Sequence, residues 1–198
     1  KRGTWWAVEN LNGDAGLYDA QVENFMPTLR GWFEETNLPA WHPPKREGFY
    51  RFLVARRSEA NEKLLFNLVT SSDGLESFDR QAFVELLKSE FGERLQGVIH
   101  TINDDKGDRV EARSGDSELV YGQAFITETL HELNFDIEMS SFFQTNPACA
   151  ERLYAEVIAA VSASDNASTG SKPFNTGEYI MDLFCGTGTI AQMLARHT

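Results

Sequence analysis

The chain has only two cysteines among its 198 residues, Cys149 and Cys185. Two thiols cannot build a disulfide framework or a four-thiolate metal cluster, so we expect an intracellular compartment, cytoplasmic or organellar. The four histidines show no metal-ligand spacing, and no apolar run approaches the roughly 18 residues that span a bilayer. No secretory signal pattern opens the chain. We therefore expect no metal site and no membrane partner.

Positive charge is also scarce, because 18 Lys and Arg stand against 30 Asp and Glu and leave a net charge of -12 at pH 7. This balance argues against a generic nucleic-acid binder. Up to Arg57, however, eight basic residues face seven acidic ones. A basic cluster interleaved with aromatic residues lies there, and it suits either phosphate contact with base stacking or a solvated strand edge. The cluster consists of Lys45, Arg46, Arg51, Arg56 and Arg57 with Trp41, Phe49, Tyr50 and Phe52.

Residues 1–139 mix helical and strand-like patterns, which is typical of an α+β module. Apolar residues recur at helical spacing over residues 19–37, where we expect Pro27 to kink or restart the helix. Strand-like runs at 49–56 and 64–70 flank a polar turn and predict an antiparallel pair. A second helix should begin at a Ser77 cap and end at Gly92. Further strands are expected at 97–102, 109–112, 118–121 and 133–139, and the last alternates most clearly between apolar and polar residues.

The remaining residues predict a helix, a flexible segment and a glycine turn. Asn146 and Pro147 suit the N-cap and first position of a helix with an apolar stripe. Residues 162–177 are rich in Ser, Asn, Thr and Gly and predict a flexible, exposed insertion. Residues 179–184 indicate a buried strand, followed by a glycine turn and a helix over 190–196. Such a turn lies at the ligand-binding edge of an open α/β sheet, although a plain connecting turn has the same pattern.

Two motifs in this part resemble those of the RNA uracil-5-methyltransferases. Asp-Leu-Phe-Cys-Gly-Thr-Gly-Thr at 182–189 is similar to the family's first cofactor motif. Ser-Phe-Phe-Gln-Thr-Asn at 141–146 is similar to its aromatic-Gln-x-Asn element, with one amphipathic helix between the two. The resemblance implies an α+β central module over residues 1–139, followed by the start of a class I (Rossmann-like) α/β methyltransferase domain over residues 140–198.

The resemblance also implies a binding site for S-adenosylmethionine. Three side chains would contact the cofactor, two glycines would shape the loop, and one aspartate would order it. They are Gln144, Phe184 and Thr189, then Gly186 and Gly188, then Asp182. Members of the family often carry Asn where Thr189 stands. The resemblance therefore implies the backbone position of Thr189 more strongly than it implies a contact from its side chain to the cofactor. A third glycine, which a dinucleotide site requires, is missing.

In this family a cysteine thiolate adds to C6 of a flipped-out uracil, C5 takes the methyl group, and a carboxylate removes the C5 proton. The family's nucleophile and base lie beyond the first cofactor motif, so we expect no catalytic residue in this chain. Cys185 lies inside the cofactor loop, and Cys149 suits packing at the start of a helix.

The sequence therefore predicts an RNA methyltransferase that modifies C5 of a uridine in tRNA or rRNA. We expect residues 1–198 alone to be inactive and to need a C-terminal half, or a partner, that completes the sheet. Two alternatives stay open. One is a non-catalytic RNA-binding or assembly protein that keeps part of the fold, and the other is a dinucleotide-dependent oxidoreductase.

Overall fold

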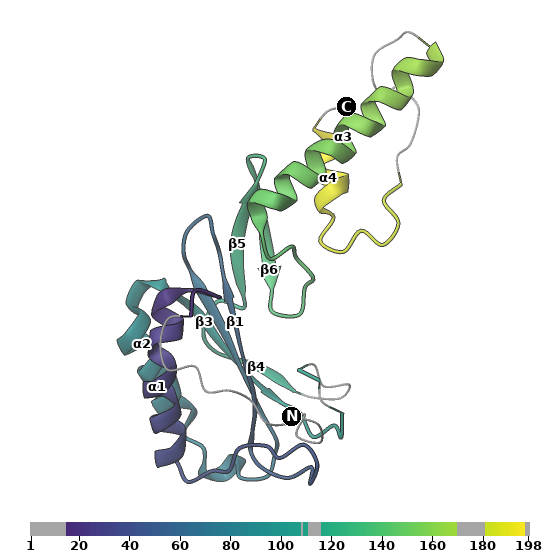
Figure 1. Cartoon of the computed structure of the whole chain (residues 1–198). Helices are drawn as coiled ribbons and strands as arrows, with labels where there is room; N and C mark the ends of the chain where they lie inside the picture. The colour runs from purple at the N-terminus through teal and green to yellow at the C-terminus, as the bar shows by residue number, and fades with distance from the viewer. Residues whose placement is uncertain (1–14, 108, 111–115, 170–180, 197–198) are drawn as a thin grey trace. The chain divides into compact units, whose positions relative to one another are not determined.

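The computed structural model describes residues 15–107, 109–110, 116–169 and 181–196, with the backbone alone for 162–169. The chain folds into two compact units, whose elements are drawn in Figure 1. The first unit comprises Lys1–Arg57 and Glu62–Ile126, and the second comprises Ser58–Asn61 and Thr127–Thr198. The second unit thus includes a short turn that comes from an earlier part of the sequence.

A four-stranded mixed sheet forms the centre of the first unit. Its order is β1 (Tyr50–Arg57), β2 (Leu64–Thr70), β3 (Leu95–Ile102) and β4 (Ser117–Gly122). The predicted antiparallel pairing of β1 with β2 is confirmed, and β3 is parallel to β2 and antiparallel to β4. Every residue of β2 is buried, as expected for a central strand with both faces covered.

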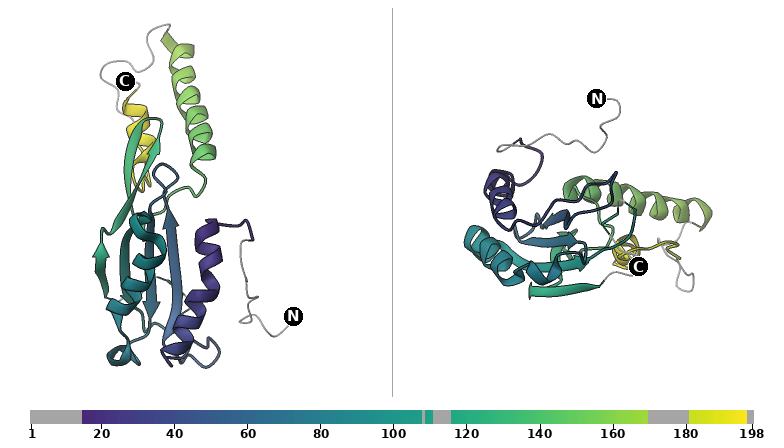
Figure 2. Two further views of the ribbon diagram at one scale, coloured as in Figure 1. Left: turned by 90° about the vertical axis from the view of Figure 1, so that its left-hand side faces the viewer. Right: turned by 90° about the horizontal axis from the view of Figure 1, so that it is seen from below.

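Two helices cover one face of this sheet, as Figures 1 and 2 both show. Helix α1 (Ala20–Glu35) begins after Asp19, whose carboxylate accepts the backbone N–H groups of Gln21 and Val22, and it continues through Pro27 as one helix. Helix α2 (Arg80–Phe91) connects β2 to β3, which permits their parallel pairing.

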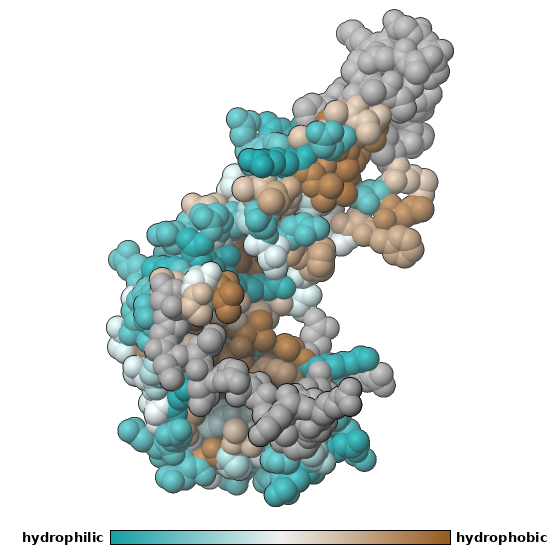
Figure 3. Space-filling model, viewed as in Figure 1, coloured by the Kyte–Doolittle hydropathy of each residue, from teal (hydrophilic) through white to brown (hydrophobic). Residues whose placement is uncertain are grey.

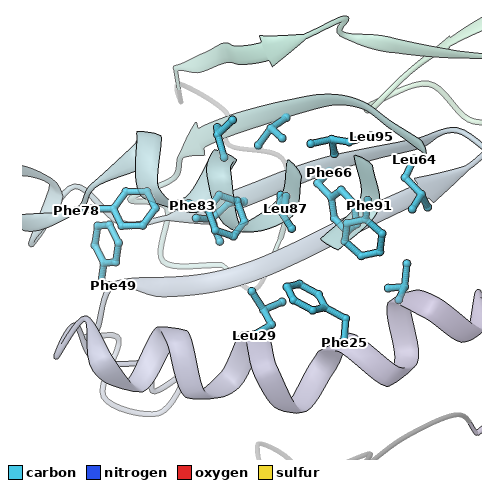
Figure 4. Packing of buried hydrophobic residues seen from close by; sticks show 14 residues of the cluster. Phe25, Leu29, Phe49, Leu64, Phe66, Phe78, Phe83, Leu87, Phe91 and Leu95 are labelled. Carbon is cyan, nitrogen blue, oxygen red and sulfur yellow. The ribbon is translucent and has the colours of Figure 1, made fainter. Parts of the chain in front are cut away.

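The core lies between these two helices and the sheet. Figure 4 shows Phe25 and Leu29 of α1 pointing toward the strands. The ring of Phe91 lies 5.3 Å from that of Phe25 and 5.2 Å from that of Phe66, so one aromatic contact joins both helices to β2. Burial of apolar side chains on this scale is the main stabilising contribution to such a unit.

The predicted start of α2 at Ser77 is wrong, although the predicted end is confirmed. Ser77 lies in a separate 3-10 turn, Leu75–Ser77, and Asp79 caps the helix. The Asp79 carboxylate accepts the N–H of Ala82 at 2.9 Å, so it satisfies a group that has no partner within the helix. Gly92 follows the helix with a φ of 52°, which favours glycine.

The backbones of β3 and of the end of β4 approach each other closely at two glycines. A Cβ on Gly97 would lie 1.9 Å from the carbonyl oxygen of Gln123, and one on Gly122 would lie 2.1 Å from that of Gln96. Only glycine fits at either position. The strand predicted near 109–112 is not formed at Arg109 or Val110, which are irregular, and residues 111–112 lie outside the described residues.

The second unit contains a hairpin of β5 (Phe125–Leu130) and β6 (Leu133–Glu138), of which the first two residues of β5 belong to the first unit. Side-chain hydrogen bonds pair Thr127 with Asp136 at 2.7 Å and Thr129 with Asn134 at 2.9 Å, so the strands run antiparallel. The alternation predicted for β6 is confirmed, because Phe135 and Ile137 are buried between exposed neighbours.

Helices α3 (Pro147–Thr169) and α4 (Thr189–Ala195) complete the second unit and pack against each other. The flexible insertion predicted to begin at residue 162 is wrong as far as residue 169, because α3 continues there. No glycine or proline interrupts residues 148–169, and alanines in this stretch favour a helix. Residues 170–177 lie outside the described residues.

The buried strand predicted at residues 179–184 is not formed at 181–184, and residues 179–180 lie outside the described residues. Met181 is 78% exposed, Leu183 71% and Phe184 104%. An apolar strand of this kind needs neighbouring elements that cover both of its faces. Within the described residues, no strand pairs with residues 181–184.

Candidate functional site

The glycine loop, residues 182–188, turns sharply into α4. Gly186 and Gly188 have φ values of 55° and 72°, and Phe184 shares this left-handed region with a φ of 65°. The N–H of Gly188 donates to the carbonyl oxygen of Cys185 at 2.8 Å, which closes the turn. A Cβ on Gly186 would meet nothing within 4 Å, so open space lies beside the backbone of this residue. The loop therefore leaves room for a ligand to approach its main chain.

Asp182 supplies the helix cap that Gly188 cannot provide. Its half-buried carboxylate accepts the N–H of Ala191, in the first turn of α4, at 3.2 Å. This N–H has no acceptor within the helix, so the contact joins the start of the loop to the helix that follows it. Such a contact is what an ordering role for Asp182 requires.

The two side chains predicted to touch the cofactor from this loop differ in exposure. Thr189 is buried, with its hydroxyl oxygen 2.8 Å from that of Thr187. Phe184 is fully exposed at the other end of the loop. Figure 3 shows apolar surface on the second unit. The large apolar side chains exposed among its described residues are those of Met181, Leu183, Phe184, Phe142 and Leu153. An exposed aromatic side chain of this kind is available for contact with a ligand.

Gln144 lies in an irregular segment between β6 and α3 and is half-buried. The ring of Phe143 beside it packs against Phe135 of β6, with 6.1 Å between ring centroids. Asn146 accepts the N–H of Cys149 at 3.0 Å, which confirms the predicted N-cap of α3. The structure thus places Asp182, Phe184 and the two glycines in one loop and Thr189 at the first position of α4. It shows no hydrogen bond from Gln144 to that loop among the described residues.

Sequence reasoning missed a set of contacts at the hairpin turn, His131–Glu132. Arg196, directly after α4, donates to the carbonyl oxygen of His131 at 2.6 Å. The Glu151 carboxylate of α3 accepts the N–H of His131 at 2.8 Å. The turn was missed because the strand before it, β5, was not predicted, and no pattern in the sequence indicates which helices contact it.

The basic cluster of the first unit does not form one exposed surface. Arg57 pairs with Asp19 and Glu62, at 3.2 Å in each case. The Arg51 guanidinium lies 4.2 Å from the centroid of the Trp41 ring and donates to the carbonyl oxygens of residues 103, 105 and 107. These cations therefore bind other parts of the unit, and Lys45 and Arg46 are the exposed members of the cluster.

Within the described residues, no group of three or more His, Cys, Asp or Glu side chains could hold a metal ion. None of the described helices is both long and apolar enough to cross a membrane. Cys149 and Cys185 are both exposed free thiols. The packing role predicted for Cys149 is therefore wrong, because its side chain at the start of α3 faces solvent.

No protein-family model matches the chain. Curated relatives do match it, and the two described next are among several that are named only as uncharacterized RNA methyltransferases. The relative from Clostridium tetani is 35% identical over 180 residues, which is 90% of this chain and 36% of the relative. The relative from Caldanaerobacter subterraneus is 38% identical over 162 residues, which is 81% of this chain and 33% of the relative. The chain thus spans about a third of the length of these curated relatives.

More distant relatives have specific names. The tRNA (uracil(54)-C(5))-methyltransferase of Pyrococcus horikoshii is 27% identical over 196 residues, which is 99% of this chain and 41% of that protein. The solved structure of the Pyrococcus abyssi tRNA (uracil-54, C5)-methyltransferase in complex with S-adenosyl-L-homocysteine matches with a TM-score of 0.68 at 25% identity. The match covers 98% of this chain and 42% of that one.

Proposed function

We propose that the whole protein methylates C5 of a uridine in tRNA or rRNA, with S-adenosylmethionine as the methyl donor, because nearly the whole chain is similar to two tRNA (uracil-54, C5)-methyltransferases. The observation that carries the proposal is the glycine loop. Asp182 caps the helix after it, and the backbone at Gly186 is open to a ligand. A solved relative with the same fold was crystallised with S-adenosyl-L-homocysteine.

The residues of this chain fit one part of a cofactor site. Gly186 and Gly188 would let the main chain approach the cofactor, and Asp182 would hold the loop in that shape. Phe184 would cover an apolar part of the cofactor with its exposed ring. Gln144 and Thr189 would supply polar contacts, since an amide can both donate and accept. When bound, the cofactor supplies an electrophilic methyl group.

We assign residues 140–198 to the first part of the methyltransferase domain, after a central module at residues 1–139. The exposed Met181 and Leu183 support this assignment, because in a complete sheet they would be covered by neighbouring strands. In this proposal the glycine loop lies at the carboxyl edge of that sheet.

The catalytic nucleophile and base belong, in this proposal, to a part of the protein outside these residues. Cys185 lies within the glycine loop, and its thiol is exposed, 3.8 Å from the carbonyl oxygen of Gly186. Cys149 is exposed near the start of α3. Neither thiol has a His, Lys or Arg partner among its hydrogen bonds to the described residues, and such a partner is the usual means of stabilising a reactive thiolate.

The test uses the whole protein, a uridine-containing tRNA stem-loop and S-adenosylmethionine labelled in its methyl group. We expect label in 5-methyluridine, and a whole protein that binds the cofactor but labels no RNA would instead favour the non-catalytic alternative. Residues 1–198 alone should give no turnover. Any turnover by this segment would refute the assignment of the nucleophile to another part of the protein.

Gln144→Ala tests the polar contact to the cofactor. Loss of one hydrogen bond to a bound ligand costs about 1 kcal/mol, so the KM for S-adenosylmethionine should rise roughly fivefold. The matched control is Gln81→Ala, because Gln81 is exposed on α2 and bonds only to its helix neighbour Glu85 among the described residues. An unchanged KM in Gln144→Ala would remove Gln144 from the site.

A further inference from the structure

The turn between β5 and β6 holds two consecutive residues in a strained backbone conformation. His131 has a φ of 46° and Glu132 a φ of 65°, in a region that side chains other than those of Gly, Asn and Asp adopt at a cost. Two-residue hairpin turns of this kind usually carry Asn-Gly or Asp-Gly. Strain of this kind persists where the surroundings hold the backbone in place, and it is often found near functional sites.

Both helices of the second unit bind this turn. On one side, Glu151 of α3 accepts the N–H of His131 at 2.8 Å, and the ring Nε2 of His131 lies 2.8 Å from the carbonyl oxygen of Glu151. On the other side, Arg196 at the end of α4 donates to the carbonyl oxygen of His131 at 2.6 Å and to the Glu132 carboxylate at 3.1 Å. The main-chain N–H and C=O of one residue thus bind two different helices.

The same hairpin also contacts the segment that carries Gln144. Phe135 of β6 packs against Phe143, which precedes Gln144 directly. At the other end of α4, the cap from Asp182 to Ala191 joins the helix to the glycine loop. The hairpin is therefore connected to both parts of the proposed cofactor site, to Gln144 through Phe143 and to the glycine loop through Arg196 and α4.

We propose that the turn His131–Glu132 positions the cofactor site, with Arg196 and Glu151 as positioning residues that fix α4, and hence the glycine loop, against α3. This inference rests on the proposed function, because the ligand of the loop is taken to be S-adenosylmethionine. Neither residue need touch the cofactor. Their effect would be to keep the loop in its binding conformation before the cofactor arrives, which lowers the entropic cost of binding.

The two contacts of Arg196 should contribute unequally to cofactor binding. The Glu132 side chain is 87% exposed, and an ion pair in that position contributes little. The charged hydrogen bond to the carbonyl oxygen of His131 restrains a backbone and should carry most of the effect. Arg196→Ala should therefore weaken cofactor binding much more than Glu132→Ala.

The experiment measures equilibrium binding of S-adenosylmethionine to the whole protein, together with KM and kcat on RNA. Arg196→Ala should raise the Kd and KM for the cofactor about tenfold and leave kcat at saturating cofactor within about twofold. Arg196→Lys should recover part of the loss, because a lysine can still donate to the His131 carbonyl. Glu132→Ala should change the Kd less than about twofold. The matched control is Arg152→Ala, which removes an exposed arginine of α3.

Cofactor binding by Arg196→Ala that equals that of the wild type would overturn the proposal. So would an equal loss in Arg152→Ala, because the effect would then follow from charge alone. If the wild-type protein binds no S-adenosylmethionine, the proposed function fails, and amide hydrogen exchange tests the positioning separately. Arg196→Ala and Glu151→Ala should each speed exchange at residues 188–192 relative to Arg152→Ala, because each removes a contact to His131. Unchanged exchange in both variants would reject the positioning role.

Discussion

The buried histidine of β3 should make the stability of the first unit depend on pH. His100 is 3% exposed, its Nε2 lies 2.9 Å from the hydroxyl oxygen of Thr70, and its ring faces that of Phe78 with 5.4 Å between centroids. Burial, with a smaller contribution from the positive charge of Arg80, lowers the pKa of His100 to about 4. The ordinary pKa of histidine, which applies to the unfolded chain, is about 6.5.

The unfolded chain therefore takes up a proton at a higher pH than the folded unit does. The contribution of neutral His100 to stability is fully present above pH 6.5 and is lost as the pH falls toward 4. With about 1.36 kcal/mol for each unit of pKa shift, the loss over this range amounts to roughly 3 kcal/mol. Protonation of carboxylates acts over the same range, so a difference between variants must isolate the histidine.

Urea unfolding at several pH values between 7 and 4.5 provides the assay, with tryptophan fluorescence as the signal. Trp32 and Trp41 lie in the first unit, so their fluorescence reports on that unit. His100→Gln keeps a group that can bond to Thr70 but does not titrate, and it should lose clearly less stability below pH 6.5 than the wild type. His42→Gln, in a loop, should follow the wild type. Equal pH dependence in His100→Gln and the wild type would refute the reasoning.

Two further variants test single contacts in the second unit. Gly188→Ala places a side chain at a φ of 72°, which costs about 1 kcal/mol and should weaken cofactor binding by the whole protein roughly fivefold. The control is Gly31→Ala within α1, where an added Cβ would meet nothing within 4 Å and should leave stability unchanged or raise it. Equal cofactor binding by the two variants would refute the argument. Glu128→Gln removes the charge from a buried carboxylate that accepts the N–H groups of Glu59 at 2.7 Å and Ala60 at 3.0 Å. It should lower the free energy of unfolding by about 1–2 kcal/mol and speed amide exchange at Glu59 and Ala60. Glu156→Gln, at an exposed position of α3, is the control and should do neither.

Strand β6, in which one face is buried and the other is exposed to solvent, was predicted well because Phe135 and Ile137 alternate with polar residues. Its partner β5 was missed because Glu128 occupies an inward position between Ile126 and Leu130, where a charge breaks the apolar pattern. The charge is tolerated because backbone N–H groups donate to it, and two of those donors, Glu59 and Ala60, are far away in the sequence.

The glycine loop was predicted from local requirements, since positive φ values and a helix cap involve only residues close together in the sequence. The strand before it was predicted from apolar composition, which indicates a buried strand only if other strands cover it. In the same way, the parallel pairing of β2 with β3 depends on where α2 places the returning chain. Such relations are properties of the assembled sheet and leave no signal in the strand itself.

The carboxylate of Glu128 has a consequence for how this protein could be divided. It binds the turn at Ser58–Asn61, and the hydroxyl of Ser58 donates to the carbonyl oxygen of Thr127 at 2.7 Å. A gene cut after residue 126 would therefore produce one piece whose turn has lost its acceptors and another whose buried anion has lost the N–H donors of residues 59 and 60. Any recombination that exchanges one unit for another, in the laboratory or in evolution, must carry residues 58–61 together with residue 128.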